Sequence, residues 1–134
     1  MDFSSIKPGL RTQKTQIVTE QFTASALGSG GLAVFATPAM IAFMEMTALS
    51  AVDPLLPAGW STVGTEINVK HLSATPTGME VRCEAELLEV DGRRLLFRVE
   101  AFDGAGKIGE GTHGRYIVEN ERFLQRVNEK ATKH

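Results

Sequence analysis

The sequence predicts an α+β fold in which one long central helix is wrapped by an antiparallel sheet of five strands. Residues 36–52, ATPAMIAFMEMTALSAV, form an apolar run that contains a single charged residue, Glu45. One strand-like segment precedes this run, and four segments joined by short turns follow it. Strands grouped in this way around one helix indicate the α+β class with a largely antiparallel sheet.

Composition restricts what the chain can be. With 134 residues and a net charge of −2, residues 1–134 are expected to form one domain without a nucleic-acid-binding face. The single cysteine, Cys83, excludes an internal disulfide framework, and no cluster of Cys and His predicts a metal site. The N-terminus lacks the apolar core of a signal peptide, and the apolar run is short for a membrane span. We therefore expect a soluble, cytoplasmic protein with no membrane partner.

The segment before the helix contains one predicted strand and one loop. Residues 11–22 have β-branched character, which predicts the strand. Residues 23–35 predict a loop, because the run GSGG at 28–31 is too rich in glycine for a regular element. No Gly-Lys-Ser/Thr follows this run, so it is not a phosphate-binding loop.

The helix is expected to begin at Thr37-Pro38, with a hydroxyl N-cap followed by proline at the first helical position. It should end before Pro54, which cannot continue a helix. Apolar residues lie on nearly all sides, as in helices that are buried all round. Because one sheet covers only one side, either the loop at 23–35 and the C-terminal tail cover the other, or a second copy of the chain does.

We favour the second copy, as a homodimer or a higher oligomer. The side chains that it would cover are Met40, Phe43, Met44 and Leu49.

Four further strands and a short helix are predicted after the central helix. Residues 60–72 alternate in character, which places Thr65, Ile67, Val69 and His71 on one face of a strand. Residues 79–90 and 93–102 alternate similarly, and Asp91-Gly92 between them is a hairpin signal. Residues 107–118 predict the last strand. The tail places Phe123, Leu124 and Val127 at the spacing of a short amphipathic helix that frays at its end.

Glu45 is the first candidate for chemistry. A carboxylate in an apolar helix costs several kcal/mol unless it is paired or protonated. His71 is the second candidate, since its strand face is expected to point at the helix that carries Glu45. We therefore expect Glu45 to raise the pKa of His71, and the imidazolium to keep Glu45 ionised.

Thr37 and Arg115 are weaker candidates. The free N–H groups of Ala39 or Met40 at the helix start could stabilise an oxyanion near Thr37. Thr37 and Glu45 lie about 12 Å apart along the helix, so they share a site only through a fold-back or a partner subunit. Arg115 alternates with His113 and Ile117; it could contact an anion, but the sequence alone favours a solvated charge. Cys83 lies in phase with Val81 and Ala85, which favours a core residue.

Four motifs carry a resemblance to a known family. They are FATPAMIAFMEM, STVGTEINVKHLSATPTG, VDGRRLLFRVEAFDG and KIGEGTHGRYIV, which together span roughly residues 34–124. In this order the sequence resembles the hot-dog-fold acyl-CoA thioesterases, and most closely the fluoroacetyl-CoA thioesterase group. The resemblance implies a hot-dog fold, with a dimer that carries its active sites at the interface.

The resemblance also implies the residues of the site. The catalytic set would be Thr37, Glu45 and His71, with substrate contacts at Gly64, Phe35 and Arg115. It implies hydrolysis of an acyl-CoA thioester without metal or other cofactor, coenzyme A being part of the substrate. The segment before the helix is shorter than the phenylalanine-bearing lid of the fluoroacetyl enzyme and retains only Phe22 and Phe35. A general short-chain acyl-CoA is therefore expected rather than a fluorinated one.

Two other functions remain open at this stage. The first is a non-catalytic acyl-CoA-binding protein on the same fold, against which the complete set of Thr37, Glu45 and His71 argues. The second is a hydratase, which lacks its expected Asp-then-His signature here. Whether Glu45 would act as nucleophile or as general base is also open.

Overall fold

A computed structural model describes residues 3–132 of the chain. Its elements in chain order are β1 (Arg11–Ile17), the 3₁₀ turn η1 (Glu20–Phe22), α1 (Ala24–Leu27), α2 (Thr37–Val52), the 3₁₀ turn η2 (Asp53–Leu55), β2 (Trp60–His71), β3 (Glu80–Asp91), β4 (Arg94–Asp103), β5 (Gly106–Glu119) and α3 (Asn120–Thr132).

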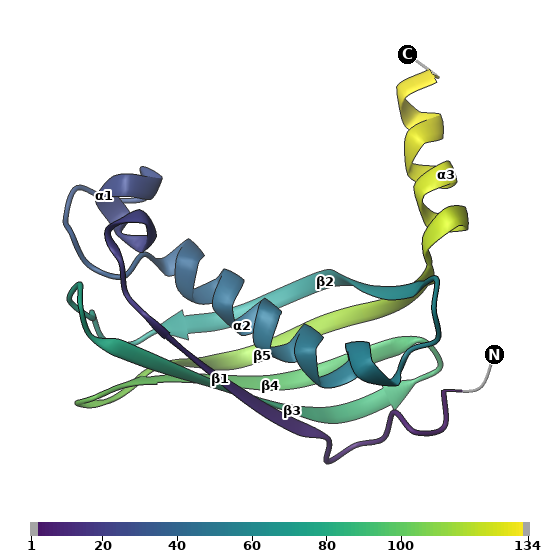
Figure 1. Ribbon diagram of the computed structural model, residues 1–134, viewed down its shortest axis with the longest axis horizontal. Coiled ribbons are helices and arrows are strands. Elements are labelled where there is room, and N and C mark those ends of the chain that lie inside the picture. Colours follow the sequence, from purple (N-terminus) through teal and green to yellow (C-terminus); the bar gives the residue numbers. More distant parts are fainter. Residues whose placement is uncertain (1–2, 133–134) are drawn as a thin grey trace.

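The five strands form one antiparallel sheet in the order β1-β3-β4-β5-β2. α2 lies across one face of this sheet, which curves around it (Figure 1). The predicted fold, a long central helix wrapped by five antiparallel strands, is therefore confirmed. Because β1 and β2 are the edge strands, the twelve-residue β2 has a neighbour, β5, on one side only.

The sheet builds the core from the alternating residues that the sequence predicted. In β3 and β4 the inward positions are fully or almost fully buried, and they pack with the buried face of α2. They are Val81, Cys83, Ala85, Leu87, Leu95, Phe97, Val99 and Ala101. Cys83 is thus a core residue, as predicted.

α2 covers the predicted range, but two details of the prediction were wrong. Ala36 is the N-cap and Thr37 is the first helical residue, so the Thr37 hydroxyl does not cap the helix. Met40, Phe43 and Met44 are buried by the chain's own sheet, because the curved sheet reaches further around α2 than a flat one would. The outward face consists of Ala42, Met46 and partly exposed neighbours.

The segments on either side of α2 are more structured than predicted. β1 ends at Ile17, and the predicted strand residues 20–22 form η1, closed by a hydrogen bond from Phe22 N to Thr19 O. The predicted loop contains α1, whose start is capped by Thr23 and whose end is Gly28 in the left-handed conformation. A helix of four residues is too short to show a periodic sequence pattern.

A β-bulge in β2 changes the predicted face of Thr65. Gly64 pairs with Arg115 and Glu66 with Gly114, so Thr65 is the extra residue between them. Ile67, Val69 and His71 are partly buried on the helix side, as predicted, whereas Thr65 is exposed. The bulge also places Gly64 on the inner face.

The β3–β4 turn lies one residue further along the chain than Asp91-Gly92 suggested. Asp91 pairs with Arg94, which leaves Gly92 and Arg93 as the two turn residues. Gly92 has a φ of 61°, in the left-handed region that such a turn requires.

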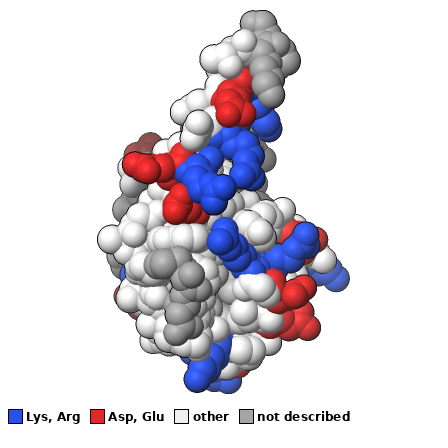
Figure 2. Space-filling view, turned by 90° about the vertical axis from the view of Figure 1, so that its right-hand side faces the viewer, with Lys and Arg blue, Asp and Glu red and all other residues white. Residues whose placement is uncertain are grey.

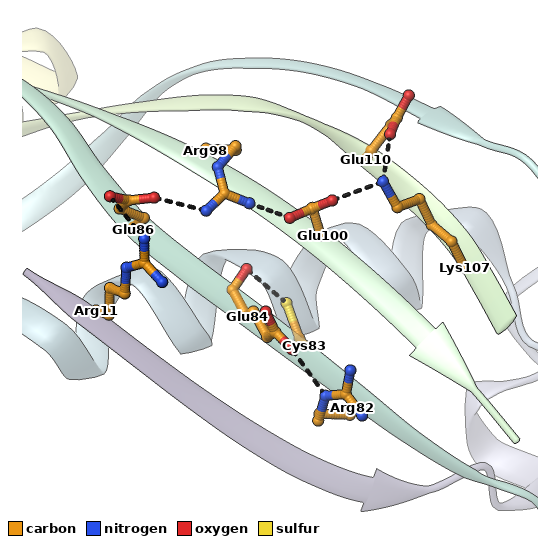
Figure 3. Close-up of polar contacts among 9 residues, drawn as sticks. All are labelled: Arg11, Arg82, Cys83, Glu84, Glu86, Arg98, Glu100, Lys107 and Glu110. Atoms are coloured by element: carbon orange, nitrogen blue, oxygen red, sulfur yellow. Dashed lines mark hydrogen bonds and ion pairs between the residues drawn. The ribbon is translucent and has the colours of Figure 1, made fainter. Parts of the chain in front are cut away.

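The outer face of the sheet carries a ladder of ion pairs (Figure 3). The ladder runs across β1, β3, β4 and β5 through Arg11, Glu86, Arg98, Glu100, Lys107 and Glu110. Arg82 forms a separate pair with Glu84 at 2.9 Å. Arg11, Arg82, Arg98 and Lys107 are thus each matched by an acid.

α3 is the predicted amphipathic helix, and it projects from the end of the sheet opposite α1 (Figure 1). Leu124 and Val127 are exposed, and Phe123 is partly buried. The expected fraying falls partly on residues 133–134, outside the described residues. None of the helices between residues 3 and 132 is long and apolar enough to cross a membrane.

Candidate active site

Thr37 and His71 form a direct hydrogen bond, 2.7 Å from Oγ1 to Nδ1. Thr37 stands at the start of α2, and His71 is the last residue of β2. Because the N-cap position is Ala36, the Thr37 hydroxyl is not used to cap the helix and is available to His71. Two of the three predicted catalytic residues therefore lie together.

The environment of His71 favours the neutral ring. Burial lowers the pKa of His71, and the Ser73 backbone opposes this effect in part. Nε2 is buried and has no hydrogen-bond partner within residues 3–132. The prediction that Glu45 raises the pKa of His71 is wrong for the single chain, because Glu45 is not among the groups that act on this ring.

The segments that carry this pair are fastened together by a buried threonine. Thr75 O accepts a hydrogen bond of 2.8 Å from Phe35 N, two residues before Thr37. Thr75 Oγ1 donates to Asp103 Oδ2 at 2.8 Å, and Asp103 Oδ1 accepts from the backbone N–H groups of Ala105 and Gly106. Asp103 thus connects the β4–β5 turn to the loop after β2, and through Thr75 to the start of α2.

A cavity of about 300 Å³ opens beside the Thr37–His71 pair. Its lining comes from α1, the segment before α2, the end of β2 and the loop after β2. Phe35, a predicted substrate contact, lines this cavity, although its side chain is only 1% exposed. Phe22 instead lines a separate apolar groove on the β1 side of α2.

Glu45 lies against Gly64, away from the Thr37–His71 pair. A Cβ placed on Gly64 would be 2.9 Å from Glu45 Oε2. The same Cβ would be 3.4 Å from His113 Cε1 and 3.6 Å from Arg115 Nη1. The absence of a side chain at Gly64 therefore leaves the room that the carboxylate occupies.

Arg115 is the buried cation beside this carboxylate. Its Nε donates to Thr62 Oγ1 at 2.8 Å and its Nη2 to Thr62 O at 2.9 Å. Burial lowers the pKa of Arg115, and the charges of Glu45 and Asp53 oppose that shift. The sequence favoured a solvated charge at Arg115, which is wrong: the side chain is anchored to β2 and faces Glu45.

His113 holds Arg115 from the other side. His113 Nδ1 lies 2.8 Å from Glu66 O, so Nδ1 carries the proton and donates to this carbonyl. Nε2 is then free to accept from Arg115 Nη1, at 3.0 Å. Burial is the main cause of the lowered pKa of His113, and the Arg115 charge adds to it. The ring is therefore neutral and acts as an acceptor for the guanidinium.

The candidate residues thus form two groups within one chain. Thr37 and His71 form the first group, and Glu45, Gly64 and Arg115 form the second. His113 also belongs to the second group. The sequence analysis missed its role, because one hydrogen-bond partner, Glu66 O, lies on another strand and the other, Arg115, lies two residues further along β5. Between residues 3 and 132 no set of His, Cys, Asp and Glu side chains could hold a metal ion.

Comparisons with known proteins agree on one family. A family model described as fluoroacetyl-CoA-specific thioesterase matches residues 18–121. A fluoroacetyl-CoA thioesterase from Streptantibioticus cattleyicolor is 45% identical over 97 residues, which cover 72% of this chain and 70% of that protein.

Solved structures give the same result. A structure of the fluoroacetyl-CoA thioesterase FlK matches with a TM-score of 0.88 and 37% identity, and covers 93% of this chain and 97% of that one. A threonine-to-serine mutant of that enzyme in complex with acetyl-CoA matches at 0.89, with 37% identity over 93% and 98% of the chains. A hot-dog-like protein from Thermanaerovibrio acidaminovorans, 24% identical over 97% of each chain, matches at 0.88 and supports the fold alone.

Proposed function

The chain belongs to the family of fluoroacetyl-CoA-specific thioesterases, and from this membership we propose that it hydrolyses a small acyl-CoA to the free acid and CoA. It is a thioester hydrolase of the hot-dog fold. The observation that carries the assignment of the site is the 2.7 Å hydrogen bond between Thr37 and His71 beside a cavity at the start of a helix.

The Thr37–His71 pair suits the acyl end of the substrate. A neutral His71 with its proton on Nε2 accepts from the Thr37 hydroxyl through Nδ1, which increases the electron density on the threonine oxygen. The start of α2 adds partial positive charge where the carbonyl oxygen becomes an oxyanion. Two backbone groups, the N–H of Ala39 and that of Met40, were predicted as donors to this oxyanion. Met40 N–H already donates to Ala36 O, so Ala39 N–H is the donor that remains. As the CoA thiolate departs, Nε2 of His71 can give it a proton while Nδ1 takes the proton of the Thr37 hydroxyl. A proton from the water consumed in the hydrolysis then returns to Nε2, and Nδ1 returns its proton to Thr37.

Glu45 supplies the attacking oxygen or activates a water, and it reaches this pair from a second copy of the chain. Within one chain Glu45 lies beside Gly64, about eight helical residues, or 12 Å, from Thr37. β2 is a long edge strand with unpaired backbone groups, which favours antiparallel pairing with the β2 of a copy. Such pairing brings the Gly64 region of one chain towards His71 of the other, so each site would be shared.

A small, unfluorinated acyl group is the expected substrate. The segment between β1 and α2 contributes α1 and Phe35 to the cavity, and Phe22 points to a different groove. We therefore expect acetyl-CoA and other short acyl-CoAs to be hydrolysed without an advantage for fluoroacetyl-CoA.

A panel of acyl-CoA thioesters with a thiol-detecting reagent tests the proposal. CoA release from short-chain members, lost in Glu45→Gln while the variant stays folded, is the expected result. No release from any member would refute the enzyme, and tight binding without release would favour the non-catalytic acyl-CoA-binding alternative. Incorporation of oxygen-18 from water into Glu45 during a single turnover would identify it as the nucleophile rather than the base.

A further inference from the structure

A hollow of about 160 Å³ lies at the foot of α3, and arginines surround it. Arg93 comes from the β3–β4 turn, and Arg122 and Arg126 come from the first two turns of α3. The floor is the end of β5, from Tyr116 to Glu119. Figure 2 shows the Lys and Arg side chains that gather at the base of the projecting helix.

These arginines lack the acidic partners that four other cations of the described residues have. On the outer face of the sheet Arg11, Arg82, Arg98 and Lys107 each form an ion pair. Within residues 3–132 none of Arg93, Arg122 and Arg126 does. Arg122 and Arg126 are four residues apart on one helix, where like charges repel each other. Glu119 is the single acid in the lining, so the hollow has an uncompensated positive charge.

The position of Arg93 is fixed before any ligand binds. Its carbonyl accepts a hydrogen bond of 2.9 Å from Ile117 N, which holds the turn against β5. Its guanidinium stacks over the Trp60 ring, with Cζ 4.9 Å from the centroid. Phe3 packs edge-on against Trp60 at 5.2 Å. A planar guanidinium held in this way presents paired N–H donors that match the oxygens of a phosphate.

We propose that this hollow binds the phosphate-bearing end of the CoA thioester, the 3′-phosphorylated adenosine diphosphate. The inference rests on the proposed function, since it assigns the residues that bind the CoA half of that substrate. Thr37, His71 and Glu45 carry out the hydrolysis of the thioester bond. The arginines contribute only affinity, through charge-assisted hydrogen bonds to phosphate oxygens.

The hollow serves the site of the neighbouring copy rather than that of its own chain. Trp60 and His71 are the two ends of β2, roughly 36 Å apart at about 3.3 Å per residue. Figure 1 shows α3 and α1 at opposite ends of the sheet. Antiparallel pairing of two β2 strands places the Trp60 end of one beside the His71 end of the other. The thioester then lies at Thr37 of one chain while the phosphates lie at the arginines of its copy.

The test is the double variant Arg122→Ala/Arg126→Ala, assayed with acetyl-CoA and with S-acetyl-N-acetylcysteamine, which lacks the nucleotide. Alanine favours the helix, so the fold is kept. The KM for acetyl-CoA should rise roughly tenfold to a hundredfold with kcat unchanged, as expected for lost hydrogen bonds to charged groups. The kcat/KM for the truncated thioester should not change. Arg82→Ala, which removes a paired arginine from the outer face, is the matched control. An unchanged KM for acetyl-CoA would overturn the proposal.

Direct binding separates this proposal from the proposed function. Adenosine 3′,5′-bisphosphate should bind the wild-type protein in a calorimeter and fail to bind the double variant, whether or not any thioester is hydrolysed. Absence of binding to the wild type, or equal competition by inorganic phosphate at the same concentration, would refute a nucleotide subsite.

A mixed dimer tests which chain supplies the arginines. One partner carries Thr37→Ala and the other carries Arg122→Ala/Arg126→Ala, so the single active Thr37 belongs to the chain without the arginines. A wild-type KM for acetyl-CoA in this hybrid is expected, because the intact hollow lies on the other chain. A raised KM would show that the arginines act within their own chain and would overturn the arrangement across the interface.

Discussion

Replacement of Gly64 by alanine tests whether Glu45 acts from the position where the structure places it. The new Cβ would lie 2.9 Å from Glu45 Oε2, whereas ordinary contact begins at about 3.4 Å. The carboxylate must therefore move by about 0.5 Å, the difference between these two distances. Because Oε2 is at the end of a flexible side chain, the movement does not require a shift of the backbone. The other two neighbours, His113 Cε1 and Arg115 Nη1, are at 3.4 and 3.6 Å and need not move.

The expected loss of stability is small. Overpacking costs about 1–3 kcal/mol, and it is offset by the gain of about 0.5–1 kcal/mol from replacing a strand glycine with alanine. The net loss in the free energy of unfolding is thus about 0–2.5 kcal/mol, which lowers Tm by about 10 °C at most. Activity should respond more strongly, because a displacement of 1 Å at a reacting group can cost about a hundredfold. We expect kcat/KM to fall roughly tenfold or more.

The assay measures CoA release and thermal unfolding on the same preparation. Gly104→Ala is the control, because a Cβ at Gly104 meets nothing within 4 Å. A Gly64→Ala variant with wild-type kcat/KM would refute the reasoning, since the carboxylate could then not depend on its place beside Gly64. A variant that fails to fold would contradict the expected ease with which Glu45 moves aside.

Four further predictions follow from the same geometry. Thr37→Ala should lose activity and cost about 0.5–1.5 kcal/mol in urea unfolding, the net value of its hydrogen bond to His71, since Thr37 makes no capping bond; a loss of several kcal/mol would contradict this. Arg115→Ala should cost about 1–3 kcal/mol in the same assay, because Thr62 and His113 are left with unsatisfied buried acceptors; a variant as stable as the wild type would refute it. Burial lowers the pKa values of His71 and His113 below 6.5 in the folded chain. Tm should therefore be highest above pH 6.5 and fall as the pH decreases from 6.5 through the folded pKa values, because the unfolded chain binds protons at a higher pH than the folded chain does. Burial raises the pKa of Cys83 to about 11, so a thiol reagent at pH 8 should label it only after denaturation, and rapid labelling of native protein would count against this.

The predicted elements agree with the structure wherever the pattern was local and long. The apolar run gave a sixteen-residue α2, and the alternation of residues 79–102 gave β3 and β4 with the expected buried faces. These patterns are reliable because the periods of 3.6 and 2 express which side chains share a face. The elements that were missed, α1 and η1, span four and three residues and cannot show a period.

The electrostatic predictions failed where they depended on distance across the sheet. His71 was expected beside Glu45, and its partner is Thr37 instead. Arg115 was expected in solvent, yet Thr62 and His113 hold it inside. The first error arises from the length of β2, because His71 is its last residue, seven positions beyond Gly64, where Glu45 lies. The second arises on β5, where Arg115 shares the buried face of Ile117 although arginine is seldom buried.

The sequence by itself determined the fold class, the central helix and the core positions, and it supplied Thr37, Glu45 and His71 as candidates for the chemistry. Those properties depend on neighbours within a turn of helix or along a strand, where spacing fixes orientation. The tertiary structure alone decided that Thr37 pairs with His71, that Glu45 occupies the room left by Gly64, and that Arg115 is an internal counter-charge. Thr37 and His71 are 34 positions apart in the chain, Glu45 and Gly64 are 19 apart, and Thr62 and Arg115 are 53 apart. The geometry of these contacts follows from the order of the strands in the sheet and from the bulge in β2. No local pattern encodes that geometry, because it depends on how whole strands are placed beside one another.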